Sequence, residues 1–440
     1  MKQDVKKTVS WTAENGLCSS CGICKSCCPV NAISYTRLNG KYQPQIDKES
    51  CVRCGSCLAV CPGAEMLFPK GETALESIYG TIRASYNAWS RDPVLRHVSA
   101  SGGVVSAIAA SLLKAGEYDV CFCVDQYRYD RQLKTVPVTK ELLPESWADS
   151  SLPKSRYLPV SHENAVAYIR QHPEKKVILI GNSCAMQGFR KLFERYSLDQ
   201  DHFLLIGLFC DKVFNYNIYQ YYRNDFSKGK ELSALHFKNK ESGGWPGNMK
   251  LIYADGSAEY LDKSERGKVK EYFMPERCLY CVDKLNVSAD LSVGDNYTEQ
   301  DSSPLGSNTV LLRTERGEKA WALSADMLES RPVDPKQLRK AQFLDGRLNQ
   351  YHFGVLKQRE LAKKTGEAAV LNSGIVCPGN SSEYEMAMRH GRDKLRAGEC
   401  YGEKPEELQR QIKTAERRAH GRDPRTLAER AFYAIKRRLP

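Results

Sequence analysis

The sequence has no long apolar run. No stretch of its 440 residues approaches the roughly 18–20 apolar residues that a transmembrane helix requires. The first residues, MKQDVKKTVSWTAENG, have no apolar segment after the lysines, so they do not resemble a secretory signal. There is also no low-complexity tract. We therefore expect a cytoplasmic protein with two or three folded units, because 440 residues are too many for one small core.

Cysteine, in contrast, is abundant, with 17 residues. A disulfide scaffold does not suit a reducing cytosol, so metal or redox chemistry is the expected use of these thiols. The net charge is +12, because 65 Lys and Arg residues exceed 53 Asp and Glu residues. Much of the excess lies after about residue 385. The basic balance therefore characterises a tail more than the body, and we expect no nucleic-acid partner.

The N-terminal region carries one cysteine pattern twice. The first copy is Cys18, Cys21, Cys24 and Cys28 before Pro29, and the second is Cys51, Cys54, Cys57 and Cys61 before Pro62. This is the spacing of bacterial two-cluster ferredoxins, in which the fourth cysteine of each run binds the other cluster. Zinc sites pair two C-x2-C units and need neither a third cysteine nor a trailing Cys-Pro. We predict one 4Fe–4S cluster held by Cys18, Cys21, Cys24 and Cys61, and a second held by Cys51, Cys54, Cys57 and Cys28.

Hydrophobic periodicity predicts an α+β ferredoxin-like module, then a larger α/β body, to which the resemblance described below adds flavin binding, and a helical basic tail. The expected boundaries are residues 1–70, 71–375 and 376–440. A hairpin is expected at 33–47, around Asn39 and Gly40, and another at 250–261. The other expected elements are helices at 104–116, 162–173, 185–196 and 405–419, and strands at 118–124, 175–181, 202–210, 289–295 and 308–314.

Two segments have the features of an anion-binding helix start. Ser99, Ser101, Gly102 and Gly103 precede the expected helix at 104–116. Small residues let a ligand approach the backbone, and unpaired N–H groups at a helix N-terminus favour an anion such as pyrophosphate. The segment 181–184 (GNSC) follows a strand, at the carboxyl end where open α/β sheets bind ligands. An ordinary helix N-cap remains the alternative at both places.

Four cysteines of the body lie at strand ends or in a C-x2-C pair: Cys184, Cys210, Cys278 and Cys281. They could converge on a third 4Fe–4S cluster, or they could be ordinary buried thiols or part of a zinc site. The remaining cysteines carry no motif. Cys27 is expected to be a bystander that could substitute for Cys28, and Cys121 and Cys123 are expected to pack in a strand. Cys377 and Cys400 lie far from any motif.

Several segments occur in a fixed order between about residues 80 and 330. They are SASGGVVSAIAASLL, KSRYLPV, GNSCAMQGFRK, LIGLFC, GGWPG, CLYCVDKLNVSADLSVGD and VLLRT. As a set they resemble the family of coenzyme F-420 hydrogenase/dehydrogenase beta subunits. The resemblance implies an FAD in the body with an iron–sulfur cluster beside it. It implies a flavin lined by Ser101, Gly102, Gly103, Lys154, Ser155, Asn182 and Ser183, and a cluster held by Cys184, Cys210, Cys278 and Cys281.

These features favour an iron–sulfur, flavin-dependent oxidoreductase. Electrons would pass from ferredoxin or another low-potential donor through 4Fe–4S clusters to FAD, and then to an organic substrate such as a polysaccharide-biosynthesis intermediate. Two alternatives stay open: an electron-transfer beta subunit that reduces or oxidises a deazaflavin coenzyme, and an electron relay with no substrate of its own. The catalytic acid is not assigned by sequence; candidates by residue type are His97, Lys154, His236, Asp283 and Asp295.

The C-terminal segment has an apolar stripe beside a cationic face. Leu427, Ala431 and Ile435 recur every four residues, with Phe432 and several basic residues between them. Such a helix packs back on the body, lies on an anionic membrane surface, or docks on an acidic electron-donor protein. All three alternatives stay open from the sequence.

Overall fold

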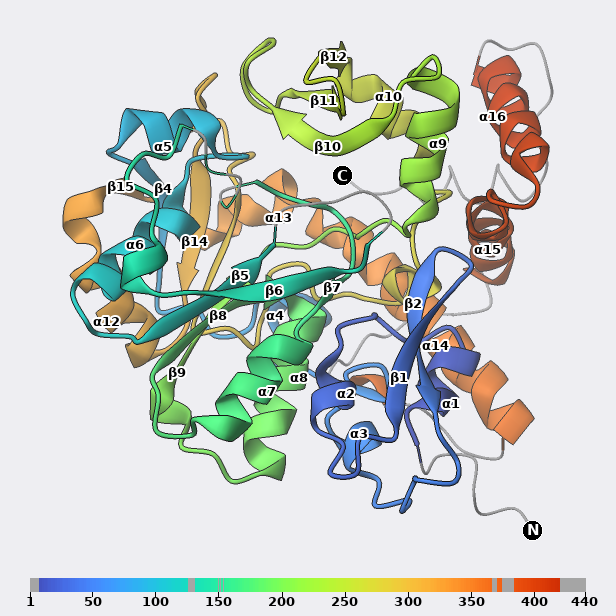
Figure 1. Ribbon diagram of the computed structural model, residues 1–440, viewed down its shortest axis with the longest axis horizontal. Coiled ribbons are helices and arrows are strands. Elements are labelled where there is room, and N and C mark those ends of the chain that lie inside the picture. The colour runs from blue at the N-terminus through green and yellow to red at the C-terminus, as the bar shows by residue number, and fades with distance from the viewer. Residues whose placement is uncertain are drawn as a thin grey trace.

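A computed structural model describes residues 8–125, 131–148, 150, 152, 154–365, 370–373 and 384–419. Figure 1 shows a small N-terminal module, in blue, against a larger α/β body. The C-terminal helices α15 (Glu385–Glu399) and α16 (Pro405–Ala419), in red, lie on the same side of the body as this module. The architecture therefore matches the expected order of an α+β module, an α/β body and a helical C-terminal region.

The N-terminal module is built around a hairpin and three short helices. Its elements are α1 (Ser10–Glu14), α2 (Ile23–Ser26), β1 (Ile33–Leu38), β2 (Lys41–Ile46) and α3 (Ser56–Ala59). The hairpin confirms the predicted turn, since Asn39 and Gly40 have φ values of 50° and 71°. The turn inserts into the body, where the N–H of Tyr216 donates to the carbonyl of Gly40 at 2.7 Å. A Cβ on Gly40 would lie 2.7 Å from Cγ of Asn217, so only glycine fits.

Nine strands of the described residues form one mixed sheet in the order β15–β4–β14–β13–β9–β8–β5–β6–β7. Their bounds are β4 (Ala84–Ser90), β5 (Val120–Val124), β6 (Leu133–Val138), β7 (Val160–Ser161), β8 (Val177–Asn182), β9 (Phe203–Leu208), β13 (Leu291–Asp295), β14 (Asn308–Leu312) and β15 (Leu328–Pro332). The central strands β13, β9, β8 and β5 are parallel. The carboxyl ends of these strands therefore share one edge of the sheet, as expected for an α/β fold.

Apolar side chains alternate between the two faces of this sheet. Val177 and Leu179 pack on one face with α7 (Glu163–Gln171), α8 (Ser183–Arg195) and the N-terminal module. Ile178 packs on the other face with α6 (Val104–Lys114) and α12 (Glu315–Leu323). The central strands are thus buried on both sides. The N-terminal module occupies one face in place of further helices, and most of its cysteines belong to the same hydrophobic core.

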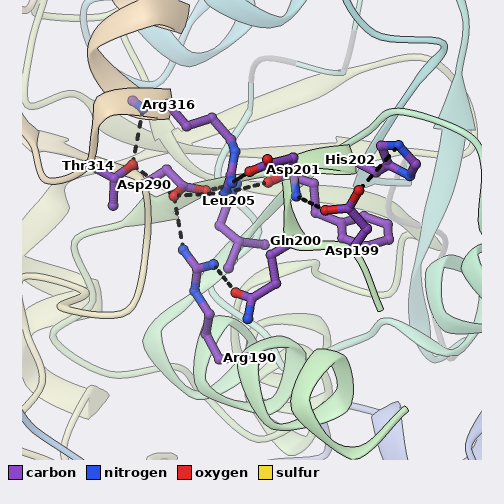
Figure 2. A network of polar contacts seen from close by, with 11 residues as sticks. Arg190, Asp199, Gln200, Asp201, His202, Leu205, Asp290, Thr314 and Arg316 are labelled. Carbon is purple, nitrogen blue, oxygen red and sulfur yellow. Dashed lines mark hydrogen bonds and ion pairs between the residues drawn. The ribbon is translucent and has the colours of Figure 1, made fainter. Parts of the chain in front are cut away.

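Asp290 ties the amino ends of the central strands to two helices, as Figure 2 shows. Its side chain is 1% exposed. One carboxylate oxygen accepts the N–H of Leu205 at 2.8 Å, and the other accepts the hydroxyl of Thr314 at 2.9 Å. The second oxygen, Oδ1, also pairs with two guanidinium groups. Nη2 of Arg190, on α8, lies 3.0 Å from it, and Nη1 of Arg316, on α12, lies 3.4 Å from it. This buried network lies at the edge of the sheet opposite the carboxyl ends of the strands.

The remaining elements surround the body. β10 (Leu232–Asn239), β11 (Asn248–Tyr253) and β12 (Ala258–Leu261) form an antiparallel sheet, which includes the hairpin predicted at 250–261. The other elements are β3 (Glu65–Leu67), α4 (Ala74–Tyr79), α5 (Pro93–Val98), η1 (Lys140–Leu142), η2 (Gln200–His202), α9 (Asn217–Phe226), α10 (Lys263–Val269), α11 (Glu276–Leu279), η3 (Ala325–Met327), η4 (Pro335–Gln337), α13 (Leu338–Ala341), α14 (Leu344–Thr365), β16 (Val370–Ser373), α15 (Glu385–Glu399) and α16 (Pro405–Ala419).

The described part of the tail packs back on the protein. Leu395, on α15, joins a core that also contains Trp11 and Tyr280, while Leu408, on α16, packs with tyrosines of α9. Hydrophobic cores therefore cross both expected domain boundaries, which themselves stay a prediction. The predicted stripe at Leu427, Ala431, Phe432 and Ile435 lies outside the described residues, as does Cys377. Among the described helices, none combines the length and apolar character that a membrane span requires.

Candidate iron–sulfur and coenzyme site

The first cysteine group brings Cys61 to the first run of cysteines. Burial raises the pKa of both Cys18 and Cys21 to about 12, and the charge of Cys61 adds to each rise. Burial also raises the pKa of Cys24, and charges on Cys21 and Cys61 raise it further. Such effects act over short distances in a buried site, so these four thiols share one small volume. The N–H of Ser20 donates to Sγ of Cys18 at 3.3 Å.

The second cysteine group lies closer to the surface. Burial raises the pKa of Cys57, and charges on Cys61 and Cys28 add to the effect. The N–H of Ala32 donates to Sγ of Cys28 at 3.3 Å. Cys51 is half-buried and Cys54 is exposed. Cys27, the expected bystander, is buried beside this group. Burial is the largest cause of its raised pKa, and charges on Cys57, Cys28 and Cys54 raise it further.

The third cysteine group joins segments that are far apart in the chain. Cys184 lies in the first turn of α8, Cys210 follows β9, and Cys278 and Cys281 flank the end of α11. Burial raises the pKa of Cys210 most, and charges on Cys278, Cys184 and Cys281 raise it further. Two hydrogen bonds hold the segments together. The hydroxyl of Ser183 donates to the carbonyl of Asp283 at 2.8 Å, and the N–H of Cys210 donates to that of Lys284 at 2.9 Å.

All three groups consist of thiols, which are the ligands that iron–sulfur clusters take. Among the described residues, no three His, Cys, Asp or Glu side chains are arranged to hold a single metal ion. A 4Fe–4S cluster makes a different demand, because each thiolate binds a different iron atom. Four neighbouring thiols in each group, with backbone N–H groups that donate to Sγ of Cys18 and Cys28, fit that demand. The residues predicted as ligands therefore fit the group, and their role as ligands stays a prediction.

A cavity of about 1270 Å³ opens beside the third group, at the carboxyl ends of β8 and β9. Its walls include the four thiols of the third group and Cys21 of the first. Of the residues predicted to line the flavin, the walls contain Ser101, Gly103, Lys154, Ser155, Asn182 and Ser183. Gly102 is not in the wall. It faces the sheet, where an added Cβ would lie 2.7 Å from Oδ1 of Asn308.

The cavity wall has more basic than acidic side chains. The basic ones are Lys154, Arg156, Lys212, Lys238, Arg266, Lys270, Arg277, Lys284, Arg339, Lys340, Arg347 and Lys394; the acidic ones are Asp211, Glu271, Asp283, Asp295 and Asp345. Burial lowers the pKa of Lys154 to about 8. Burial would raise the pKa of Asp295, but its ion pair with Lys238 lowers it. A surplus of cations in the wall favours a ligand with several negative charges.

Family comparisons match most of this site. Residues 17–64 match the 4Fe-4S dicluster domain, and residues 85–143 and 174–336 match the N-terminal and C-terminal models of the coenzyme F420 hydrogenase/dehydrogenase beta subunit. The chain belongs to this family of beta subunits. The dicluster match also shows that the N-terminal module is an iron–sulfur domain.

The chain is similar to curated relatives at low sequence identity. A component of the F420H2 dehydrogenase of Methanosarcina mazei is 23% identical over 73% of this chain and 86% of its own length. The coenzyme F420-dependent sulfite reductase of Methanocaldococcus jannaschii is 26% identical over 70% of this chain and 46% of its own length. A chain in the solved F420-reducing [NiFe] hydrogenase complex of Methanosarcina barkeri is 21% identical. That alignment covers 64% of this chain and 94% of the other, with a TM-score of 0.48.

Not all of the candidates for the catalytic acid line the cavity. Lys154, Asp283 and Asp295 line it, whereas His97 and His236 are not among its lining residues. His97 is exposed. His236 is half-buried among cations, and burial and Lys154 lower its pKa to about 4. Burial raises the pKa of Asp283 to about 6. The structure thus leaves three of the five candidates beside the space for a ligand.

Two buried arginines of the site were missed in the sequence. Arg347, on α14, donates from Nη2 to the carbonyl of Cys210 at 2.9 Å and from Nη1 to that of Cys281 at 3.3 Å. It lies beyond residue 336, where the family match ends, and no sequence motif marks it. Arg277 precedes Cys278 directly and is 3% exposed. Its position beside the C-x2-C pair was the one available signal.

Proposed function

We propose that this chain is the iron–sulfur electron-transfer subunit of an F420-related oxidoreductase, and that it exchanges electrons between its clusters and a deazaflavin coenzyme. The observation that carries the proposal is the shared cavity. The third cysteine group, Cys21 of the N-terminal module and the start of α6 all line it. A coenzyme in this cavity would lie beside a cluster that is itself next to the first cluster.

The names of the relatives favour the deazaflavin alternative over FAD with a polysaccharide-biosynthesis intermediate. A flavin-type coenzyme would supply hydride chemistry, whereas the clusters carry single electrons. The chain's own residues would bind and orient the coenzyme. The start of α6 offers backbone donors at Gly103, and Lys154 and the other wall cations offer positive charge to an anionic tail. FAD stays a second prediction for the same cavity.

The cysteine groups are ordered from the surface to the cavity. Cys54 of the second group is exposed. A charge on Cys61 of the first group raises the pKa of Cys57, and a charge on Cys21 raises the pKa of Cys184 in the third group, so neighbouring groups lie close together. A partner protein that exchanges electrons would therefore meet the chain near Cys54. Ferredoxin or a partner subunit would fill this role.

Iron and sulfide analysis tests the third cluster. Anaerobically reconstituted protein should hold about twelve iron atoms per chain, as three 4Fe–4S clusters require. Replacing both Cys278 and Cys281 by Ser should lower this by about four, while Cys400→Ser, at a half-buried thiol outside the three groups, should change nothing. About eight iron atoms in the unaltered protein, or zinc in place of iron, would remove the proposal's basis.

Coenzyme exchange tests the activity itself. The reconstituted protein should oxidise reduced deazaflavin with a viologen dye as electron acceptor, and the Cys278→Ser, Cys281→Ser protein should not. Mass analysis of ligand released from the purified protein separates FAD from a deazaflavin. A protein that binds neither, yet passes electrons between two protein carriers, would instead be the relay without its own substrate.

A further inference from the structure

Arg277 reaches from the third cysteine group to the first. It lies on α11 directly before Cys278, and its Nη2 is 2.9 Å from Sδ of Met66. The same nitrogen donates at 3.4 Å to the carbonyl of Pro62, which follows Cys61 of the first group. Burial raises the pKa of Cys281, and the charge of Arg277 opposes that rise. The guanidinium therefore lies where the N-terminal module meets the body.

Two nitrogens of this guanidinium are unmatched. Nε and Nη1 of Arg277 are buried, and neither makes a hydrogen bond with any described residue. Nor does Arg277 form an ion pair within the described ranges. A guanidinium has five N–H donors and keeps its charge, so buried and unmatched donors are expensive and rare. Arg347, the neighbouring buried arginine, differs because its terminal nitrogens donate to carbonyl oxygens of two ligand segments.

We propose that Arg277 donates N–H groups of its two unmatched nitrogens, Nε and Nη1, to sulfur atoms of the iron–sulfur clusters held by the first and third cysteine groups. The inference rests on the proposed function, because it needs the third cluster. Sulfur atoms of a cluster accept hydrogen bonds, and these bonds and the local charge set the reduction potential. A cluster with four thiolates is anionic, so it also supplies the counter-charge that Arg277 otherwise lacks.

The consequence concerns the step between the two modules. Reduction adds negative charge to a cluster, and a nearby cation with N–H donors stabilises the reduced form. Arg277 therefore raises the potential of a cluster that it contacts. Because it lies between the first and third groups, it sets how readily an electron crosses from the N-terminal module to the cavity. Its role is to tune a cluster rather than to hold the fold together.

Redox titration of the full chain, followed by electron paramagnetic resonance, tests this role. Arg277→Met should reduce the equilibrium constant for reduction of one cluster at least tenfold, which is about 59 mV for one electron. Arg277→Lys keeps the charge and should shift the potential less. The control is Arg316→Met, which removes a half-buried arginine at the far edge of the sheet. Its cluster potentials should equal those of the unaltered protein.

A second measurement detects the contact itself. Protein labelled with ¹⁵N-arginine should show a weak ¹⁵N coupling to a reduced cluster in pulsed resonance spectra. Arg277→Lys should abolish it, which also excludes Arg347 as the source. Absence of the coupling in the unaltered protein, or potentials in Arg277→Met equal to those of the control, would overturn the inference. If Arg277→Met loses its clusters, the labelled protein and Arg277→Lys still decide.

The two proposals fail in distinguishable ways. A chain with about eight iron atoms has no third cluster, and the proposed function falls with the inference. A chain with about twelve iron atoms and coenzyme turnover, but no ¹⁵N coupling, keeps the proposed function and loses the role of Arg277.

Discussion

Cys21 of the N-terminal module and Cys184 of the body are close neighbours in space. Burial raises the pKa of Cys184 most, and a charge on Cys21 raises it further, ahead of Cys278 and Cys281 of its own group. The N–H of His162, at the start of α7, also donates to the carbonyl of Cys21 at 2.8 Å. The two cysteines that join the modules thus lie at the point where electrons would pass between them.

Lys154 should make coenzyme binding dependent on pH. Burial lowers its pKa to about 8, with Arg156 and Lys250 adding to the effect and Glu241 opposing it. The cation is present below about pH 8 and is lost above it, so affinity for an anionic coenzyme should fall as pH rises from 7 to 9. Fluorescence titration with deazaflavin measures this. Arg stays charged at these pH values, so Lys154→Arg should bind with a flatter pH profile.

The same titration separates Lys154 from lysines at the surface. Lys154→Gln should weaken binding about tenfold at pH 7, the size of one charge-assisted hydrogen bond. Lys140→Gln, at an exposed lysine, should leave the affinity unchanged. Equal effects in the two variants would contradict a site for the coenzyme at Lys154.

Arg195 should assist encounter with an acidic electron carrier. Its Nη2 donates to the hydroxyl of Ser56 at 3.2 Å. Hydrogen bonds between Cys54 and Ser56 are the larger cause of the lowered pKa of Cys54, and the charge of Arg195 contributes to it. Arg195→Glu should slow electron exchange with an acidic ferredoxin about tenfold at low ionic strength, and less in high salt.

Stopped-flow mixing with reduced ferredoxin measures that rate. Lys228→Glu, at a side chain 80% exposed on another face, serves as the matched control. Reduction by a small viologen dye should be the same in all three proteins. If both charge reversals slow ferredoxin equally, Cys54 is not the point of exchange.

Asp290 should matter for stability rather than for electron transfer. Asp290→Asn leaves Arg190 and Arg316 without their buried counter-charge, and breaking such a pair costs about 3–5 kcal/mol. Asp201→Asn removes an ion pair whose carboxylate side chain is 86% exposed, which costs about 0–1 kcal/mol. Anaerobic unfolding followed by circular dichroism should therefore give Asp290→Asn a much lower free energy of unfolding than Asp201→Asn. Similar curves would show that the network in Figure 2 contributes little.

The sequence predicted the parts of this site whose geometry is local. Cysteine spacing predicted that Cys61 joins the first group and Cys28 the second, because in this repeated run the fourth cysteine binds the other cluster. The sequence left open whether Cys184 and Cys210 converge; they follow the parallel strands β8 and β9, whose carboxyl ends share an edge of the sheet. The main helices and strands of the body followed from hydrophobic periodicity.

The sequence could not predict what depends on distant packing. Gly102 was assigned to the flavin, but β14 places Asn308 against it, so it faces the sheet. The contacts of Arg277 come from Pro62 and Met66, more than two hundred positions earlier in the chain. Arg347 binds the ligand segments from a helix with no motif. Such side chains become visible only when the modules are packed together.

Anaerobic mixing of reduced deazaflavin with the reconstituted full chain, followed by rapid freezing and electron paramagnetic resonance, tests the central claim most directly. The account predicts that the coenzyme is oxidised while signals of reduced 4Fe–4S clusters appear, and that Cys278→Ser with Cys281→Ser abolishes both changes. A coenzyme that stays reduced beside oxidised clusters, in protein whose clusters dithionite still reduces, would contradict the account.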